Sequence, residues 1–216
     1  FPAPIILAIL LNELRNVVFK RIVQTISYMP YFLSTVVIVG MVVNFLSPSN
    51  GIINILLKSI FGLEEGIMFL ALPEWFRTIY VSSEIWQGVG WGTILYLAAI
   101  AGVNPELYEA ADIDGANRWQ KIRNITFQGM LPVMIILLIL NLGKMMEVGY
   151  QKIILLYNPL IYDTADVINT FVYRRGLLHA DFSFATAIGL FQSVIGFVLV
   201  LAANRIARKY SETSLW

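Results

Sequence analysis

The stretch EAADIDGANRWQKIRNITFQGMLP, residues 109–132, is polar and charged, and it interrupts an otherwise apolar sequence. Just before it, Asn104-Pro105-Glu106 combines three features of a helix start: a capping Asn, a Pro at the first helical position and an acid in the first turn. Asp114-Gly115 is a turn signal that ends this helix. The pattern therefore predicts a short helix followed by a tight turn.

A second helix is expected after the turn, from about Ala116 to Gln128. Gly129 and Pro132 predict a break between this helix and the apolar segment that follows. The apolar side chains expected along one edge of the second helix are Trp119, Ile122 and Ile125. Residues 104–131 are thus predicted to form an ordered helix–turn–helix, and a connection this ordered is usually functional.

Outward from this stretch, the composition is that of an integral membrane protein. Of the 216 residues, 58% are hydrophobic and 13% are charged, whereas a soluble domain carries about a quarter charged residues. The predicted fold class is therefore all-α, a polytopic helical bundle in a membrane. A net charge of +1 gives no reason to expect a nucleic-acid partner, and the absence of cysteine excludes a Cys-ligated metal site.

Four apolar segments are predicted to span the membrane, because a spanning helix needs roughly 20 apolar residues. They are expected at residues 27–46, 79–101, 132–150 and 184–203, and residues 1–11 are expected to be the end of a further span whose beginning is missing. Residues 1–216 are accordingly treated as a single transmembrane domain.

The basic residues predict which ends of the spans face the cytoplasm. Nine of the fifteen Lys and Arg lie in the polar linker at 12–24, the central loop at 104–131 and the tail after residue 203. Alternating spans place these three segments on one side of the membrane, and the excess of positive charge marks that side as cytoplasmic. The C-terminus is therefore also expected in the cytoplasm.

Polar side chains inside the predicted spans indicate a route for a substrate, because charged groups in a span are costly and usually face a cavity. The side chains expected on one face of the span at 79–101 are Tyr80, Glu84, Gln87 and Trp91. Those expected on the opposite wall are Asn141, Lys144, Glu147 and Gln151. Aromatic planes beside hydrogen-bonding groups suit a sugar. The alternative is structural: Glu84 pairs with Lys144 to hold two helices together, and the aromatic rings lie in the interface belt.

No pattern of catalytic or metal-binding residues is recognisable. The sequence has no G-x-x-x-x-G-K-[ST] phosphate loop, so the chain is not expected to hydrolyse ATP. His179 is the single histidine and has no partner at metal-ligand spacing. The absence of a nucleophile–base pair disfavours a membrane-embedded enzyme.

The central stretch resembles a known motif. E-A-A-x-x-D-G-A, with an Ile nine residues further on and a Pro seven after that, is similar to the EAA loop of the permease subunits of type I ABC importers. The residues that carry it here are Glu109, Ala110, Ala111, Asp114, Gly115, Ala116, Ile125 and Pro132. The loop's usual Phe falls at Ile122, and the first of its two prolines falls at Gln128.

Three further segments resemble the maltose-type carbohydrate permeases, in particular the branch for complex oligosaccharides and polysaccharide fragments. They are SYMPY at 27–31, LYNP at 156–159 and RKYSETSLW at 208–216. The resemblance covers essentially the whole chain. It implies a multi-pass protein of the bacterial cell membrane with about six spans when complete.

The resemblance also implies a role for the central loop as coupling helices that sit in a cleft of a cytoplasmic ATPase subunit. The residues expected at that contact are Glu109, Ala110, Ala111, Asp114, Gly115, Ala116, Trp119 and Ile122. The implied partners are a second and normally different permease chain, two ATPase subunits that hold ATP and Mg, an extracellular solute-binding lipoprotein and a carbohydrate. No cofactor is expected on this chain itself.

One functional alternative stays open on the residues alone. An ion-coupled secondary transporter would need no motor and would use Glu84 and Glu147 as proton or cation sites.

Overall fold

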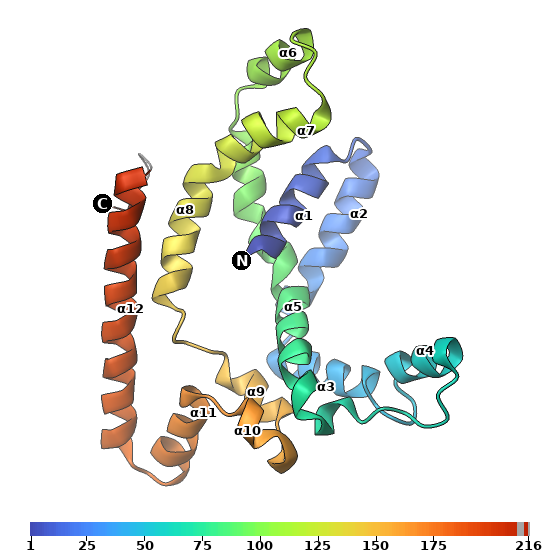
Figure 1. Ribbon diagram of the computed structural model, residues 1–216, viewed down its shortest axis with the longest axis vertical. Coiled ribbons are helices and arrows are strands. Elements are labelled where there is room, and N and C mark those ends of the chain that lie inside the picture. The colour runs from blue at the N-terminus through green and yellow to red at the C-terminus, as the bar shows by residue number, and fades with distance from the viewer. Residues whose placement is uncertain (211–213, 216) are drawn as a thin grey trace. The chain divides into compact units, whose positions relative to one another are not determined.

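The computed structural model describes residues 1–210 and 214–215, and every regular element within them is helical. The helices form two compact units (Figure 1). Unit 1 contains Phe1–Met29, Gly88–Met146 and Gln192–Trp216, and unit 2 contains Pro30–Gln87 and Glu147–Phe191. The predicted all-α class is confirmed, and the tail motif at 208–216 falls partly outside the described residues.

Unit 1 holds the central stretch and the helices that support it. Its elements are α1 (Pro2–Glu13), α2 (Val17–Tyr28), the second half of α5 (Pro73–Ala101), α6 (Pro105–Ile113), α7 (Arg118–Lys121), the π-helical turn η3 (Ile122–Thr126), α8 (Phe127–Gly143) and the second half of α12 (Phe182–Tyr210). Its buried core joins α1, α5 and α8 through Ile5, Ala8, Tyr96, Ile100 and Met130.

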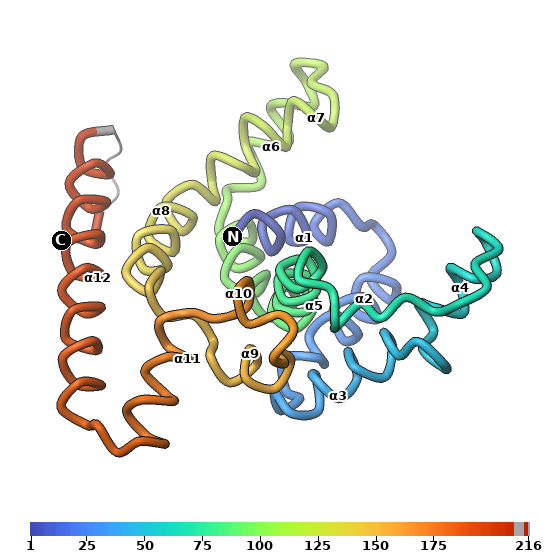
Figure 2. Tube along the Cα trace, turned by 60° about the horizontal axis from the view of Figure 1, so that its bottom comes forward, coloured from blue at the N-terminus to red at the C-terminus, as the bar shows by residue number. Residues whose placement is uncertain are grey.

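Unit 2 is built from shorter helices around the first half of α5. They are the 3-10 turn η1 (Met29–Phe32), α3 (Thr35–Phe45), α4 (Ile52–Phe61), η2 (Phe69–Ala71), α9 (Tyr150–Leu156), η4 (Pro159–Ile161), α10 (Tyr162–Ala165), α11 (Ile168–Val172) and the π-helical η5 (Tyr173–Leu178), followed by the first part of α12. Figure 2 shows α3 beside α9. The core of this unit is Val39, Phe76, Ile153, Leu156, Ile161 and Ala165.

Two helices in the described part of the chain are long and apolar enough to cross a membrane, Arg118–Gly143 and Phe182–Lys209. The number rises to four if each of two bent pairs counts as one span. These pairs are Val17–Phe32 with Thr35–Phe45, bent by 107°, and Pro73–Ala101 with Pro105–Ile113, bent by 68°. The number of spans therefore stays a prediction.

The predicted span at 27–46 is not one continuous helix. The helix that includes Ser27 ends in the 3-10 turn at Met29–Phe32, and a new helix begins at Thr35. Ser34 caps this new helix by accepting a hydrogen bond from the backbone N–H of Val37 at 3.4 Å. The apolar run conceals the break, because a capping Ser is also a common residue inside membrane helices.

The helix bounds also differ from the predicted span 132–150 at both ends. Gly129 and Pro132 lie inside a helix that runs unbroken from Arg118 to Gly143, and the chain is not regularly helical between Lys144 and Gly149. Pro is tolerated in an apolar membrane helix, where neighbouring groups compensate the missing hydrogen bond. Gly129 and Pro132 would mark a helix end in a soluble protein, whereas this apolar helix accommodates both.

The segment 157–181, which lies between the expected spans at 132–150 and 184–203, is folded into short helices. Asp166 holds it together: its carboxylate accepts two hydrogen bonds from Arg174, at 2.9 and 2.6 Å, and another from the buried Thr170. Asn158 donates to the carbonyl of Leu70 at 2.8 Å, which ties the segment to the rest of unit 2.

Candidate functional site

The first arm of the central element is α6, and its start follows from the sequence. The side chain of Asn104 accepts a hydrogen bond from the backbone N–H of Glu106 at 3.0 Å, and Pro105 occupies the first turn. Both features satisfy or remove N–H groups that have no partner inside a helix. The predicted helix start is confirmed.

The bend after α6 is a Schellman motif centred on Gly115. The backbone of this glycine has a φ of 72°, in the left-handed region. Its N–H donates to the carbonyl of Asp112 at 3.2 Å, and the N–H of Ala116 donates to the carbonyl of Ala111 at 2.9 Å. These two bonds close the end of the helix and turn the chain back, which glycine permits at little steric cost.

The second arm begins with a reciprocal cap. The N–H of Gln120 donates to the side chain of Asn117 at 2.9 Å, and the N–H of Asn117 donates to the side chain of Gln120 at 2.7 Å. From Arg118 the helix continues through η3 into α8 without interruption, as Figure 1 shows. The second arm is therefore the beginning of an apolar helix long enough to span a membrane.

Two contacts tie the arms to each other. Lys121 forms an ion pair with Asp112 at 2.6 Å. The hydroxyl groups of Tyr108 and Thr126 share a hydrogen bond of 3.0 Å, and Thr126 is buried. With both ends of the bend cross-linked in this way, the element is a stiff bent peg rather than a flexible loop. We refer to residues 104–126 as the bent peg.

The predicted ATPase contacts lie mostly on the surface of the bent peg. Glu109, Ala110, Asp114, Gly115 and Trp119 are exposed, while Ala111, Ala116 and Ile122 are half-buried. Two further apolar side chains were missed by the sequence analysis: Leu107, 52% exposed, and Ile113, 87% exposed. With Trp119, 70% exposed, they are three exposed apolar side chains on an otherwise polar element.

The polar residues of the proposed pathway fall into separate places. In unit 2 the ammonium of Lys152 lies 2.5 Å from the carboxylate of Glu84 and donates to the side-chain oxygen of Gln87 at 2.9 Å. The amide of Gln87 in turn donates to the carbonyl of Leu33 at 3.3 Å. Tyr80, one turn before Glu84, packs against the core of unit 2 and stacks on Phe76.

The structural alternative named the wrong lysine. Glu84 pairs with Lys152 of α9, not with Lys144. Lys144 is exposed and belongs to unit 1, and no ion pair of it is found among the described residues. Glu147 and Gln151 are exposed residues of unit 2.

Trp91 and Asn141 both belong to unit 1. Both line a cavity of 480 Å³ whose walls also include Gly92, Tyr96 and Leu137. Of the eight predicted pathway residues, the structure therefore brings together Glu84 with Gln87, and Trp91 with Asn141. Among the described residues, no three His, Asp or Glu side chains lie close enough together to hold a metal ion.

Most of the contacts that hold the bent peg and Glu84 in place could not be predicted from the sequence. The reciprocal cap of Asn117 and Gln120 follows a recognisable spacing of three residues. Two contacts join the arms of the peg: Tyr108 with Thr126 and Asp112 with Lys121. Their residues belong to different helices, so no periodic pattern along the sequence predicts them. Lys152 stands alone beside an apolar run, which is the one sign that its charge is buried.

Comparison with known proteins gives consistent matches. The sequence profile of the family described as "Binding-protein-dependent transport system inner membrane component" matches residues 1–212. The polygalacturonan/rhamnogalacturonan transport system permease protein YteP of Bacillus subtilis (strain 168) is 43% identical over 216 residues, which make up 100% of this chain and 67% of that protein. The arabinooligosaccharides transport system permease protein AraP of the same organism is 26% identical over 97% of this chain and 65% of that protein.

A solved structure matches as well. It is described as the crystal structure of a bacterial alginate ABC transporter in complex with alginate pentasaccharide-bound periplasmic protein. Its matching chain superposes with a TM-score of 0.94 at 48% sequence identity, over 99% of this chain and 74% of that chain. The present chain thus corresponds to about two thirds to three quarters of the length of these relatives.

Proposed function

Because the chain belongs to the family of binding-protein-dependent transport system inner membrane components, we propose that it is a permease subunit of an ATP-driven ABC importer for oligosaccharides or polysaccharide fragments. Family membership makes it a transport subunit of the membrane rather than an enzyme. The substrate class is supported by the names of its relatives, which refer to polygalacturonan, rhamnogalacturonan, arabinooligosaccharides and alginate.

The observation that carries the mechanism is the continuity of the bent peg with α8. The second arm and the apolar helix form one continuous helix from Arg118 to Gly143. A force applied to the peg by a partner is therefore transmitted through helical backbone into the apolar segment instead of being absorbed by a loop. ATP-driven closure of a docked ATPase would move this helix and open the pathway alternately to the two sides of the membrane.

In this proposal the remaining parts of the importer are separate chains. ATP and Mg are held by two cytoplasmic ATPase subunits, an extracellular solute-binding protein delivers the sugar, and a second permease chain completes the pathway. The bent peg and the C-terminus face the cytoplasm of a bacterial cell. The exposed apolar side chains Leu107, Ile113 and Trp119 support the docking role, because they lie on a polar element outside the predicted spans, where lipid would not cover them.

The sugar would pass the polar groups of α5. Glu84 is suited to a sugar hydroxyl because its side chain is 48% exposed, while Lys152 behind it is 3% exposed and holds it in place. An ion-coupled mechanism through Glu84 and Glu147 gains no support, since Glu84 is already neutralised by a lysine.

The docking proposal is tested by Glu109→Lys in the complete importer. Glu109 is exposed on the first arm and forms no ion pair among the described residues, so the change leaves the fold of the peg intact. We expect co-purification of the ATPase and ATP-dependent uptake to fall by about tenfold or more. Reversing the charge of a contact residue weakens the binding free energy by more than about 1 kcal/mol.

The matched control is Glu64→Lys, the same change on an exposed acid in the loop after α4. It should leave both measurements unchanged. Normal assembly and uptake with Glu109→Lys would refute the docking role of the first arm. Uptake that survives ATP depletion and collapses with an ionophore would instead favour ion coupling.

A further inference from the structure

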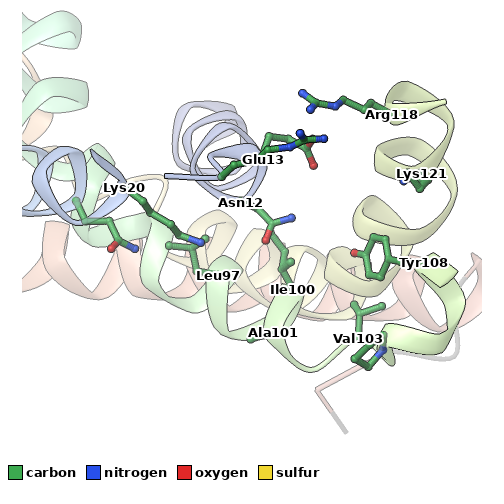
Figure 3. A pocket seen from close by; sticks show the side chains of 13 residues that line it. Asn12, Glu13, Lys20, Leu97, Ile100, Ala101, Val103, Tyr108, Arg118 and Lys121 are labelled. Atoms are coloured by element: carbon green, nitrogen blue, oxygen red, sulfur yellow. The ribbon is translucent and has the colours of Figure 1, made fainter. Parts of the chain in front are cut away.

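A second feature of unit 1 is a cavity of 570 Å³ beside the bent peg (Figure 3). The joint between α1 and α2 forms one wall, and α6 and α7 form the other. Figure 3 shows Arg118 reaching out from α7 in the direction of Glu13 at the end of α1. The cavity is therefore lined by segments that are far apart in the sequence.

The rim of the cavity carries an excess of positive charge. Arg15, Lys20 and Arg118 line it, and none of them forms an ion pair among the described residues. Lys121 also lines it but is neutralised by Asp112. Glu13 is the one acidic side chain in the lining. Three unpaired cations against one carboxylate leave a net surplus of two positive charges in a recess, where field lines concentrate.

The floor of the same cavity is apolar. It is made by Leu97, Ile100 and Ala101 at the C-terminal end of α5, together with Val103 of the connection that follows. These residues lie at the end of the predicted span 79–101, and Asn12 and Glu13 follow the predicted span end at 1–11, so the cavity is expected at the boundary between hydrocarbon and water. A recess with a cationic rim and an apolar floor at this depth is complementary to an amphiphile that carries a negative charge.

We propose that this cavity binds the phosphate headgroup of an anionic phospholipid, with the phosphate between Arg15, Lys20 and Arg118 and the glycerol end of the acyl chains along Leu97 and Ile100. Basic pockets between membrane helices commonly accept such headgroups. A soluble anion would use only the rim. A lipid uses both surfaces and is already concentrated at the boundary where the cavity lies.

Binding here would connect the second arm of the bent peg to α2. Lys20 belongs to α2 and Arg118 to the second arm of the bent peg. A phosphate between them joins the peg to the neighbouring helix pair, so lipid composition would tune how the peg responds to the ATPase. This regulatory consequence rests on the proposed function, whereas the lipid site itself depends only on the cavity and its position.

The experiment measures lipid retention by the complete importer and uses changes outside the bent peg. The importer is purified in mixed micelles of detergent with phosphatidylglycerol or with phosphatidylcholine, and native mass spectrometry counts retained lipid. The double variant Arg15→Gln/Lys20→Gln should retain phosphatidylglycerol at least tenfold more weakly, since each cation near a membrane surface contributes about fivefold. The control Arg21→Gln removes an exposed cation of α2 that does not line the cavity.

The outcomes separate the possible occupants. Loss of phosphatidylglycerol in the double variant, with normal retention in Arg21→Gln and little phosphatidylcholine in either, supports the site. Displacement of the retained lipid by millimolar inorganic phosphate would identify a site for free anions and overturn the proposal. Equal lipid retention in all variants would also overturn it. ATPase co-purification is recorded in parallel, so a failure of assembly is distinguished from a failure of lipid binding.

Discussion

Gly115 is the residue on which the shape of the bent peg depends. Its φ of 72° lies in the left-handed region, and a Cβ built on it meets no atom within 4 Å. Any effect of substitution therefore comes from the backbone and not from crowding. We predict that Gly115→Val loosens the end of α6 by about 1.5 kcal/mol, because β-branched residues resist this conformation, and that exchange of the backbone amides of α6 becomes about tenfold faster.

The matched variant is Gly115→Asn, which adds a side chain of similar size but tolerates left-handed backbone. Hydrogen exchange measured by mass spectrometry on the peptide that covers 105–121 should be nearly unchanged for it. Equal acceleration in both variants would show that the side chain itself is excluded at this position, against the conformational explanation.

Glu84 and Lys152 form one ion pair, but we expect their substitutions to change the stability of the protein by different amounts. The lysine side chain is 3% exposed and the glutamate side chain is 48% exposed. Glu84→Gln leaves a buried charge without its counter-ion, so we predict a loss of about 3 kcal/mol in the free energy of unfolding. Lys152→Met leaves only a carboxylate that water can reach, and we predict a loss of about 1 kcal/mol.

The asymmetry is checked by unfolding the purified complex thermally, with the double variant Glu84→Gln/Lys152→Met as the third measurement. The double variant should be as stable as Lys152→Met alone, because no charge remains buried. A double variant less stable than either single variant would mean that the pair is not the source of the effect.

Asp166 gives unit 2 a dependence on pH. Hydrogen bonds from Arg174, and secondarily from Thr170, hold the pKa of this carboxyl below its ordinary value of 3.8. A lowered pKa stabilises the folded state above pH 3.8, and this contribution is lost as the pH falls through the folded-state value. Asp166→Asn should therefore lower stability by about 1 kcal/mol at neutral pH, the scale of a partly exposed pair of good geometry.

The measurement is the difference in thermal midpoint between the wild type and Asp166→Asn, from pH 7 down to pH 3. This difference should be constant above about pH 4 and should become smaller below that pH. Asp163→Asn, at an exposed acid of α10 for which no ion pair is seen among the described residues, is the control. A difference that stays constant to pH 3 would exclude the charge of Asp166 as its origin.

At the scale of elements, α8 packs closely against the chain at the end of α5 because Gly129 has no side chain. A Cβ on Gly129 would lie 2.2 Å from a methyl carbon of Val103 but 3.6 Å from its Cβ. We predict that Gly129→Ala destabilises the complex by about 2 kcal/mol, as overpacking does. Val103→Ala removes the colliding methyl group, so Gly129→Ala/Val103→Ala should be about as stable as Val103→Ala alone.

Thermal unfolding of the three variants decides this. Restored stability in the double variant confirms a steric origin. If Gly129→Ala remained as damaging beside Val103→Ala, glycine would be needed at this position for another reason.

The elements that were predicted correctly are those fixed by neighbouring residues. Asn104, Pro105 and Gly115 act on the backbone within a few positions, so the start of α6 and its bend follow from the sequence. The break near Leu33 and the unbroken helix through Pro132 were missed. In apolar membrane segments, Pro and Gly are as often packing features as helix ends, and the neighbours that decide between these roles are remote in the chain.

For the candidate sites too, features that depend on neighbouring residues could be predicted and features that depend on tertiary contacts could not. The motif at 109–116 lies on an exposed surface, as expected, although its contact with an ATPase stays a prediction. The partner of Glu84 could not be deduced, because α9 reaches α5 only through the tertiary fold of unit 2. A periodic pattern shows which residues share a helix face but not which element covers that face.

At the scale of the whole molecule, both proposals depend on which side of the membrane holds the bent peg. An ATPase can reach it only in the cytoplasm, and basic residues near span ends favour that side. The chain contains no cysteine, so single cysteines can be introduced without background labelling. Suitable positions are exposed and lie outside the proposed contacts: Glu106 on the first turn of the peg, Ser49 after α3 and His179 after η5.

We predict opposite accessibility for these positions in intact cells of the producing strain. A membrane-impermeant maleimide should label Ser49→Cys and His179→Cys at once, because one predicted span separates each of these positions from the peg. It should label Glu106→Cys at least tenfold more slowly until the membrane is permeabilised. After permeabilisation all three should react equally, since their side chains are similarly open to solvent. Rapid labelling of Glu106→Cys in intact cells would place the peg outside, where no ATPase could move it, and transport would then need another source of force.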